Sequence, residues 1–123
     1  MNYKVSIKRI YEKKSDDDGF GIICDRIWPR GISKEQTKDY VWEKEIAPSS
    51  HIRKEFAHDP AKFPKFQEDY IKELNSNPKR NDFIKLVQEH IAYENVTLFY
   101  SAKNTEFNNA VVLCEWIKRK LEN

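Results

Sequence analysis

Hydrophobic residues along the chain follow two periods, which predicts strands separated by helices. Val5 and Ile7 alternate with polar residues, a period of two that is typical of a half-buried strand near a sheet edge. Segments 20–24 and 96–102 are strongly apolar, as expected of central strands that are covered on both faces. Segment 40–42 predicts a further short strand or an extended stretch.

Four segments carry apolar residues three or four positions apart and are predicted to form helices. They are 51–57, a segment that follows Asp59-Pro60, a segment between 78 and 94, and 110–121. Ser49 or Ser50 can cap the first helix, and Asp59 with Pro60 is a typical N-cap followed by proline. Pro64 either kinks the second helix or marks its beginning, because proline lacks the N–H that a helix interior needs.

Strands alternating with helices favour an α/β fold, in which a small, mostly parallel sheet carries helices on both faces in three layers. The 123 residues contain no internal repeat, linker or low-complexity segment, so a single compact domain over 1–123 is expected. A chain of this length buries roughly two-thirds of its unfolded surface, which suffices for a core without disulfides or metal.

The charge balance limits the classes of partner. Lys and Arg total 22 against 20 Asp and Glu, a formal charge of +2, which leaves nucleic acid possible but not indicated by net charge.

Cys24 and Cys114 both lie in apolar segments, where free thiols of a reducing cytoplasm are expected. No apolar run approaches the ~20 residues of a membrane span, and no targeting segment is recognisable. A cytoplasmic protein without a membrane partner is therefore predicted.

Polar residues follow both central strands directly. Asp25, Arg26 and Arg30 come after the first of these strands, and Lys103 and Asn104 come after the second. If the two strands are parallel, their carboxyl ends meet at one edge of the sheet, which is where ligands bind in such folds. The sequence therefore predicts a polar crevice at this edge.

Five residues of this crevice are the predicted ligand-binding residues. Arg26 and Arg30, with Lys103, can clamp a phosphate or a carboxylate, because guanidinium binds such groups in a bidentate manner. Asn104 is a further predicted contact. The alternative for the arginines is structural pairing with nearby carboxylates. Trp28 either stacks on a base or sugar or packs the loop on the core.

Asp25 and His58 are the catalytic candidates, as general acid or base. The alternatives are an Asp25 that orients an arginine or caps a turn, and a His58 that is exposed before a helix cap.

Cys24 and Arg30 have the C-x5-R spacing of cysteine phosphatases. A tryptophan and a proline lie between them, however, and their bulk and missing N–H do not suit a phosphate cradle. A buried, inert thiol is favoured.

Neither a metal nor a cofactor is predicted. The aspartates at 16–18 lack the spaced ligands of a calcium loop and are expected to form a solvated turn. No His or Cys cluster has metal-binding spacing, and the three glycines do not form a phosphate-binding loop.

Several strings spread over nearly the whole chain resemble the YeaO-like family of bacterial and archaeal proteins. They are Asp25-Arg26-Ile27-Trp28-Pro29-Arg30-Gly31, Lys44-Glu45-Ile46-Ala47-Pro48-Ser49, Arg53…Phe56…His58-Asp59-Pro60, Thr97-Leu98…Tyr100-Ser101-Ala102-Lys103 and Asn108-Asn109-Ala110-Val111-Val112-Leu113. The family is a domain of unknown function, so the resemblance implies a compact α/β fold and a cytosolic setting, but no reaction. Its pattern has an aliphatic residue at the position of Cys24, which argues against a required thiol.

Three functional interpretations follow, and the residues do not decide whether the protein is an enzyme. The first is a binder or hydrolase of a small anionic, nucleotide-like ligand that carries phosphate or carboxylate. The second is a non-catalytic nucleic-acid-binding or regulatory module. The third is an interaction scaffold whose arginines form a buried structural network.

Overall fold

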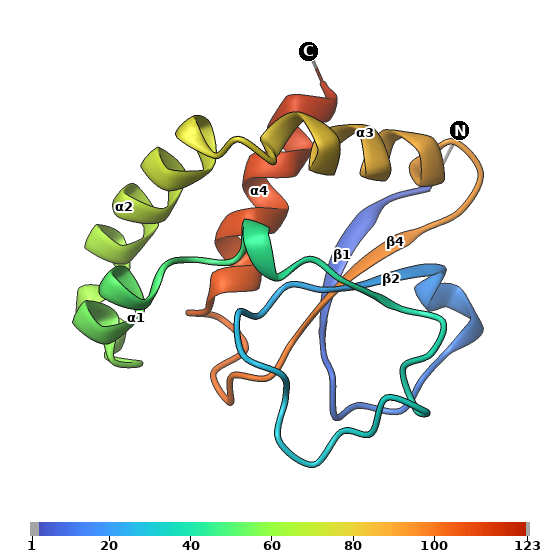
Figure 1. Cartoon of the computed structure of the whole chain (residues 1–123), viewed down its shortest axis with the longest axis horizontal. Helices are drawn as coiled ribbons and strands as arrows, with labels where there is room; N and C mark the ends of the chain where they lie inside the picture. The colour runs from blue at the N-terminus through green and yellow to red at the C-terminus, as the bar shows by residue number, and fades with distance from the viewer. Residues whose placement is uncertain (1–2, 123) are drawn as a thin grey trace.

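The computed structural model describes residues 3–122, which form one sheet and four α-helices (Figure 1). The strands are β1 (Val5–Arg9), β2 (Phe20–Ile23), β3 (Val41–Trp42) and β4 (Val96–Tyr100), in the order β1-β4-β2-β3. Every pair of neighbouring strands is parallel. The predicted α/β class is therefore confirmed, and segment 40–42 contributes an edge strand.

The parallel arrangement brings the carboxyl ends of the two central strands to the same edge of the sheet. Ile22 pairs with Leu98, and Ile23 pairs with Phe99. The residues that follow β2 consequently lie beside those that follow β4. This was the condition on which the predicted strand-end crevice depended.

The helices are α1 (Ser50–Phe56), α2 (Phe63–Ser76), α3 (Arg80–Ile91) and α4 (Asn109–Leu121), with 3-10 turns η1 (Asp16–Asp18), η2 (Lys44–Ile46) and η3 (Pro60–Lys62). Asp59 accepts a hydrogen bond from the backbone N–H of Ala61 at 3.0 Å, so it caps the short η3 turn that leads into α2. Pro64 lies in the first turn of α2, where a backbone N–H would have no partner within the helix. None of the described helices is long and apolar enough to cross a membrane.

All four helices pack on one face of the sheet. The core on this face contains sheet residues Ile22 and Leu98 and buried residues of every helix, among them Phe56, Phe66, Val87 and Leu113. Side chains alternate between the two faces of a strand, so this core takes every second residue of β2 and β4. The helices thus leave the opposite face to another part of the chain.

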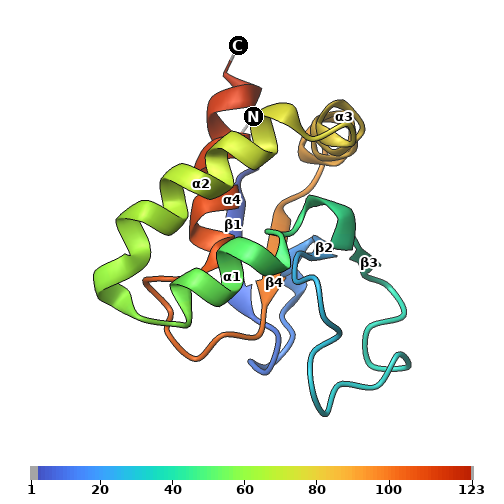
Figure 2. The ribbon, with the colours of Figure 1, turned by 60° about the vertical axis from the view of Figure 1, so that its left-hand side comes forward.

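That opposite face is covered by the loop between β2 and β3. A second, smaller core there combines Ile10, Ile23 and Phe99 with the side chains Trp28, Ile32, Tyr40 and Trp42. Tyr40 stacks on Phe99 with 4.6 Å between the ring centroids. Both faces of the sheet are covered, as predicted, but a loop occupies the layer in which further helices were expected (Figure 2). Three large aromatic side chains make this possible, because they cover a small apolar surface without a helix.

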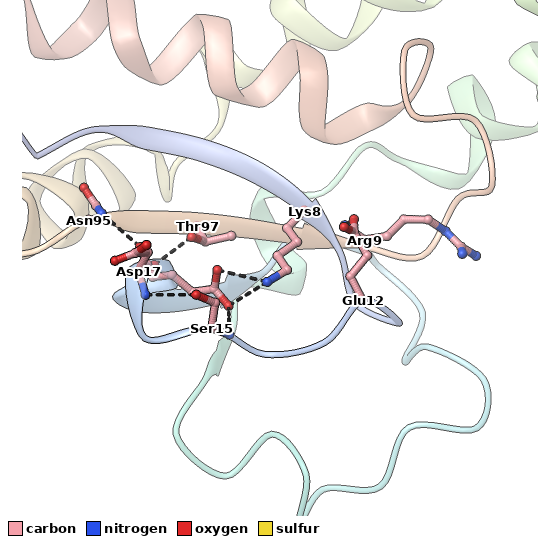
Figure 3. A network of polar contacts seen from close by, with 8 residues as sticks. Lys8, Arg9, Glu12, Ser15, Asp17, Asn95 and Thr97 are labelled. Carbon is pink, nitrogen blue, oxygen red and sulfur yellow. Dashed lines mark hydrogen bonds and ion pairs between the residues drawn. The ribbon is translucent and has the colours of Figure 1, made fainter.

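A polar network holds the amino end of β2 against β1 and β4 (Figure 3). Lys8 forms an ion pair with Asp18 at 3.0 Å, with side chains only 17% and 12% exposed. Thr97 donates its hydroxyl hydrogen to the backbone carbonyl of Asp18 at 2.7 Å, and Asn95 donates to that of Asp17 at 2.9 Å. The aspartate turn is therefore solvated only in part, since Asp18 anchors it to the sheet.

Candidate functional site

A cavity of about 410 Å³ lies at the carboxyl edge of the sheet. The residues after β2 and β4, helix α1 and the beginning of α4 contribute to its walls. Its location agrees with the rule that parallel sheets bind ligands beyond the carboxyl ends of their strands. Asp25, Arg26 and His58 are the sequence-predicted residues that line it.

Asp25 holds the carboxyl ends of the two central strands together. Its Oδ2 atom accepts hydrogen bonds from the backbone N–H of Ser101 at 2.9 Å and from the Ser101 hydroxyl at 2.6 Å. Its Oδ1 atom accepts from the side-chain amide of Asn109 at 3.1 Å, and that amide also donates to the carbonyl of Cys24 at 3.1 Å. Three donors thus satisfy a half-buried carboxylate, which fixes its position.

Arg26 supports the opposite wall of the cavity. Its Nε and Nη2 atoms donate to the backbone carbonyls of Pro48 at 3.0 Å and Ala47 at 2.8 Å. The structural partner of this arginine is therefore the backbone and not a carboxylate. These bonds use two of the five N–H groups of a guanidinium, so three remain for a ligand.

The wall that Arg26 holds is anchored from its other side as well. Tyr70 donates its hydroxyl hydrogen to the carbonyl of Ile46 at 2.8 Å. Ser49 is the N-cap residue of α1, but its hydroxyl donates to Glu73 at 2.5 Å instead of capping the helix. Segment 46–49 is consequently fixed to α2, and Arg26 is positioned by a rigid backbone.

Arg53 and Lys54 of α1 add two further positive charges to the cavity. Nη2 of Arg53 donates to the hydroxyl of Ser50 at 3.1 Å, and its Nε is buried without a hydrogen-bond partner among the described residues. Sequence reasoning did not select either residue as part of a site. The available signal was the string Arg53…Phe56…His58 in the family resemblance.

His58 reaches the cavity through an unusual backbone segment. Ala57 and His58 have φ values of 49° and 59°, a left-handed conformation that costs non-glycine residues energy. The two residues turn the chain sharply after α1, and the His58 ring lies 6.1 Å from that of Phe56. Asp25 and His58 therefore line one cavity, although they are 33 positions apart in the sequence.

The other predicted ligand-binding residues do not line this cavity. Trp28 packs edge-on against Trp42 with 5.1 Å between their ring centroids, and its Nε1 donates to the carbonyl of Ile32 at 2.7 Å. Arg30 and Lys103 are exposed. Asn104 stabilises a turn, because its Oδ1 accepts from two backbone N–H groups, both at 2.9 Å. The sequence-predicted crevice is thus divided, and ligand binding by these four residues stays a prediction.

Cys24 directly follows β2 and is fully buried. Its Sγ donates to the carbonyl of Phe99 at 3.3 Å. Burial, followed by the neighbouring charge of Asp25, raises the pKa of the Cys24 thiol well above its ordinary value. The exposed Arg30 does not complete a phosphatase-like loop around this thiol. Among residues 3–122, no group of three or more His, Cys, Asp or Glu side chains is arranged to hold a metal ion.

We expect Cys24 to be unreactive in the folded protein. At pH 8 iodoacetamide should alkylate it at least about 100-fold more slowly than in the urea-unfolded chain, because only the accessible thiolate reacts. Peptide-resolved mass spectrometry measures both rates and separates Cys24 from Cys114. Native alkylation at the rate of a free thiol would show that Cys24 is accessible and nucleophilic.

Comparison with known proteins places the chain in a family. The family model described as "Inactive DUF488-N3 subclade" matches residues 4–123. The chain belongs to this family. It is also 37% identical over 114 residues to the uncharacterised protein YeaO of Escherichia coli (strain K12), covering 93% of this chain and 96% of that protein. The predicted YeaO-like resemblance is therefore confirmed.

Mycobacterial proteins are similar over nearly the same length. The uncharacterised proteins Rv3073c of Mycobacterium tuberculosis (strain ATCC 25618 / H37Rv) and Mb3100c of Mycobacterium bovis (strain ATCC BAA-935 / AF2122/97) are each 31% identical over 112 residues. The match covers 91% of this chain and 92% of each relative. No solved structure matches the chain.

Proposed function

We propose that this DUF488-N3 protein binds a small anionic, nucleotide-like ligand in the strand-end cavity and does not convert it. One observation carries the proposal. Arg26, Arg53 and Lys54 line the same cavity, whereas the carboxylate of Asp25 already accepts hydrogen bonds from protein donors. The excess of positive charge in a concave, partly enclosed site attracts anions.

The hydrogen-bond donors that stay free in the cavity belong to its cationic side chains, which also favours an anionic ligand. Ser101 donates to Asp25, Asn109 donates to Asp25 and to the Cys24 carbonyl, and Asn108 donates to the carbonyl of Asn104. The neutral side chains that line the cavity thus direct donors toward the protein. The cationic groups keep donors for a ligand, and these suit the oxygens of phosphate or carboxylate.

The rest of the wall accommodates an apolar or planar body. Ile27, Pro48, Phe56, Phe66 and Ala102 line the cavity. A volume of about 410 Å³ lies within the range of about 300–1,000 Å³ that small-molecule sites occupy. A mononucleotide matches the cationic and apolar parts of this wall, because it joins a phosphate to a flat aromatic base.

The surroundings of Asp25 and Cys24 favour binding over catalysis. The three hydrogen bonds to Asp25 fix its carboxylate to the protein and occupy most of the lone pairs that could contact a ligand. The thiol of Cys24 is buried, and the word "inactive" in the family description agrees with a non-catalytic role. Hydrolysis is the second candidate, because Asp25 and His58 line the same cavity.

Calorimetric titration with AMP tests this proposal. We expect micromolar to millimolar binding that Lys54→Glu weakens about five- to ten-fold, since a reversed charge repels phosphate near the surface. Lys85→Glu on α3 changes the net charge equally at a residue that does not line the cavity, and it should bind like the wild type. Arg30→Ala tests the sequence-predicted ligand contact in the same assay.

Two further measurements separate the alternatives. Release of adenosine and phosphate from AMP, lost in Asp25→Asn, would replace the binding role by hydrolysis. Salt-dependent affinity for short single-stranded DNA, with no affinity for AMP, would favour the nucleic-acid module. Absence of any binding, or equal losses in Lys54→Glu and Lys85→Glu, would contradict the proposed site.

A further inference from the structure

The two arginines of the cavity are held in different ways. Arg26 is fixed, because two N–H groups bond to the backbone carbonyls of Ala47 and Pro48. The guanidinium group of Arg53 has one hydrogen bond among the described residues, to the hydroxyl of the exposed residue Ser50. The position of Arg26 is thus determined by the fold, whereas a single surface contact holds Arg53.

Arg53 also carries a polar atom without a partner. Its Nε is buried and makes no hydrogen bond with residues 3–122. Buried N–H groups are normally bonded, and an unpaired one on a charged side chain is particularly unfavourable. Since this atom is shielded from solvent, it can reach an acceptor only if the side chain turns. The observed orientation of Arg53 is therefore one that a suitable acceptor would displace.

The cavity offers a place for such an acceptor. Arg53 lines the same cavity as Arg26, so an oxyanion held by Arg26 would lie in a cavity that both residues line. Two guanidinium groups on one phosphate or carboxylate provide charge and directed hydrogen bonds together.

We propose that Arg53 is a recognition residue of this site, and that it turns from Ser50 onto the anionic group of the ligand while Arg26 stays in place. This inference rests on the proposed anion-binding function and deepens it. In the bound state Nε of Arg53 gains the acceptor that it lacks in the ligand-free protein. Binding therefore selects a second orientation of the Arg53 side chain, and the hydrogen bond between Arg53 and Ser50 opposes this change.

The proposal predicts opposite effects for two neighbouring substitutions. Ser50→Ala removes the competing acceptor and should tighten AMP binding about three-fold. The reason is that a smaller fraction of the protein then has the Arg53 side chain turned away from the ligand. Arg53→Lys keeps the positive charge but lacks Nε and the planar donor pair, and it should weaken binding about ten-fold. Ser76→Ala at the end of α2 is the matched serine control and should leave the affinity unchanged.

Arginine Nε–H signals in proton–nitrogen NMR spectra report the rearrangement directly. The Nε–H of Arg26 is bonded to Pro48, so its signal should be protected from exchange with and without AMP. The Nε–H of Arg53 should show a large shift and a slower exchange only when AMP or inorganic phosphate is added. The assignments follow from the spectra of Arg26→Lys and Arg53→Lys.

The outcomes distinguish this inference from the proposed function. If AMP binds but Arg53→Lys and Ser50→Ala both match the wild type, Arg53 is not the recognition residue and the inference fails while the binding function stands. An unchanged Arg53 Nε–H signal at saturating AMP has the same meaning. If neither AMP nor phosphate binds the wild type, the proposed function fails and the inference fails with it.

Discussion

Gly19→Ala is expected to destabilise the protein by about 3 kcal/mol or more. A Cβ atom at this position would lie 2.1 Å from the carbonyl oxygen of Asn95, which is a backbone atom. That carbonyl accepts a hydrogen bond from the N–H of Phe20 at 2.8 Å, so it cannot move away without breaking the pairing at the beginning of β2. The φ of +65° and ψ of −132° at Gly19 are also unfavourable for any residue with a side chain.

Gly31→Ala is the matched control for this effect. Gly31 has a φ of +79°, but an added Cβ would meet no atom within 4 Å. Its replacement should therefore cost only about 1 kcal/mol, the price of the left-handed backbone alone. Urea unfolding followed by circular dichroism gives both free energies of unfolding. Equal losses in the two variants would show that the contact with Asn95 does not constrain the fold.

The hydrophobic pattern was sufficient to predict the sheet and its helices. The nearly continuous apolar run before Asp25 predicts a central strand, and a similar run before Ser101 predicts the neighbouring strand. The layer on the second face was not predictable in this way. Trp28 and Tyr40 lie in a segment without regular periodicity, and their packing against the smaller core depends on where the loop returns to the sheet.

The candidate site was predicted in part, for a reason that lies in the connections. Asp25 and Arg26 directly follow a strand, so the parallel sheet alone places them at its carboxyl edge. Arg53 and Lys54 reach the same edge only because α1 crosses it, and a sequence does not show the path of a helix in space. Arg30 does not line the cavity for a related reason: four residues after Arg26, the loop has already turned toward the opposite face.

Residues at strand ends can hold the walls of a cavity together and also line that cavity. Asp25 joins β2, β4 and α4, while Arg26 joins the end of β2 to the segment before α1. The binding and structural interpretations of Arg26 are therefore compatible. Replacing Arg26 should lower both the stability of the protein and its affinity for the ligand. A second variant that lowers stability alone separates the two effects.

Arg26→Ala is expected to lower the free energy of unfolding by about 2–4 kcal/mol and to weaken AMP binding at least about 30-fold. It leaves two carbonyls of a buried segment unpaired and removes a cation that backbone carbonyls hold at the cavity. Urea unfolding and calorimetry measure the two losses under conditions in which the variant is folded.

Arg9→Ala provides the comparison that isolates binding. Arg9 also donates through two nitrogens to two backbone carbonyls, those of Ala102 at 2.8 Å and Ser101 at 3.1 Å, but it does not line the cavity. Its loss should reduce stability by a similar amount and leave most of the AMP affinity intact. A large loss of affinity in Arg9→Ala as well would mean that backbone order, and not the Arg26 charge, controls the site. Full affinity in Arg26→Ala would remove this arginine from the proposed anion-binding group.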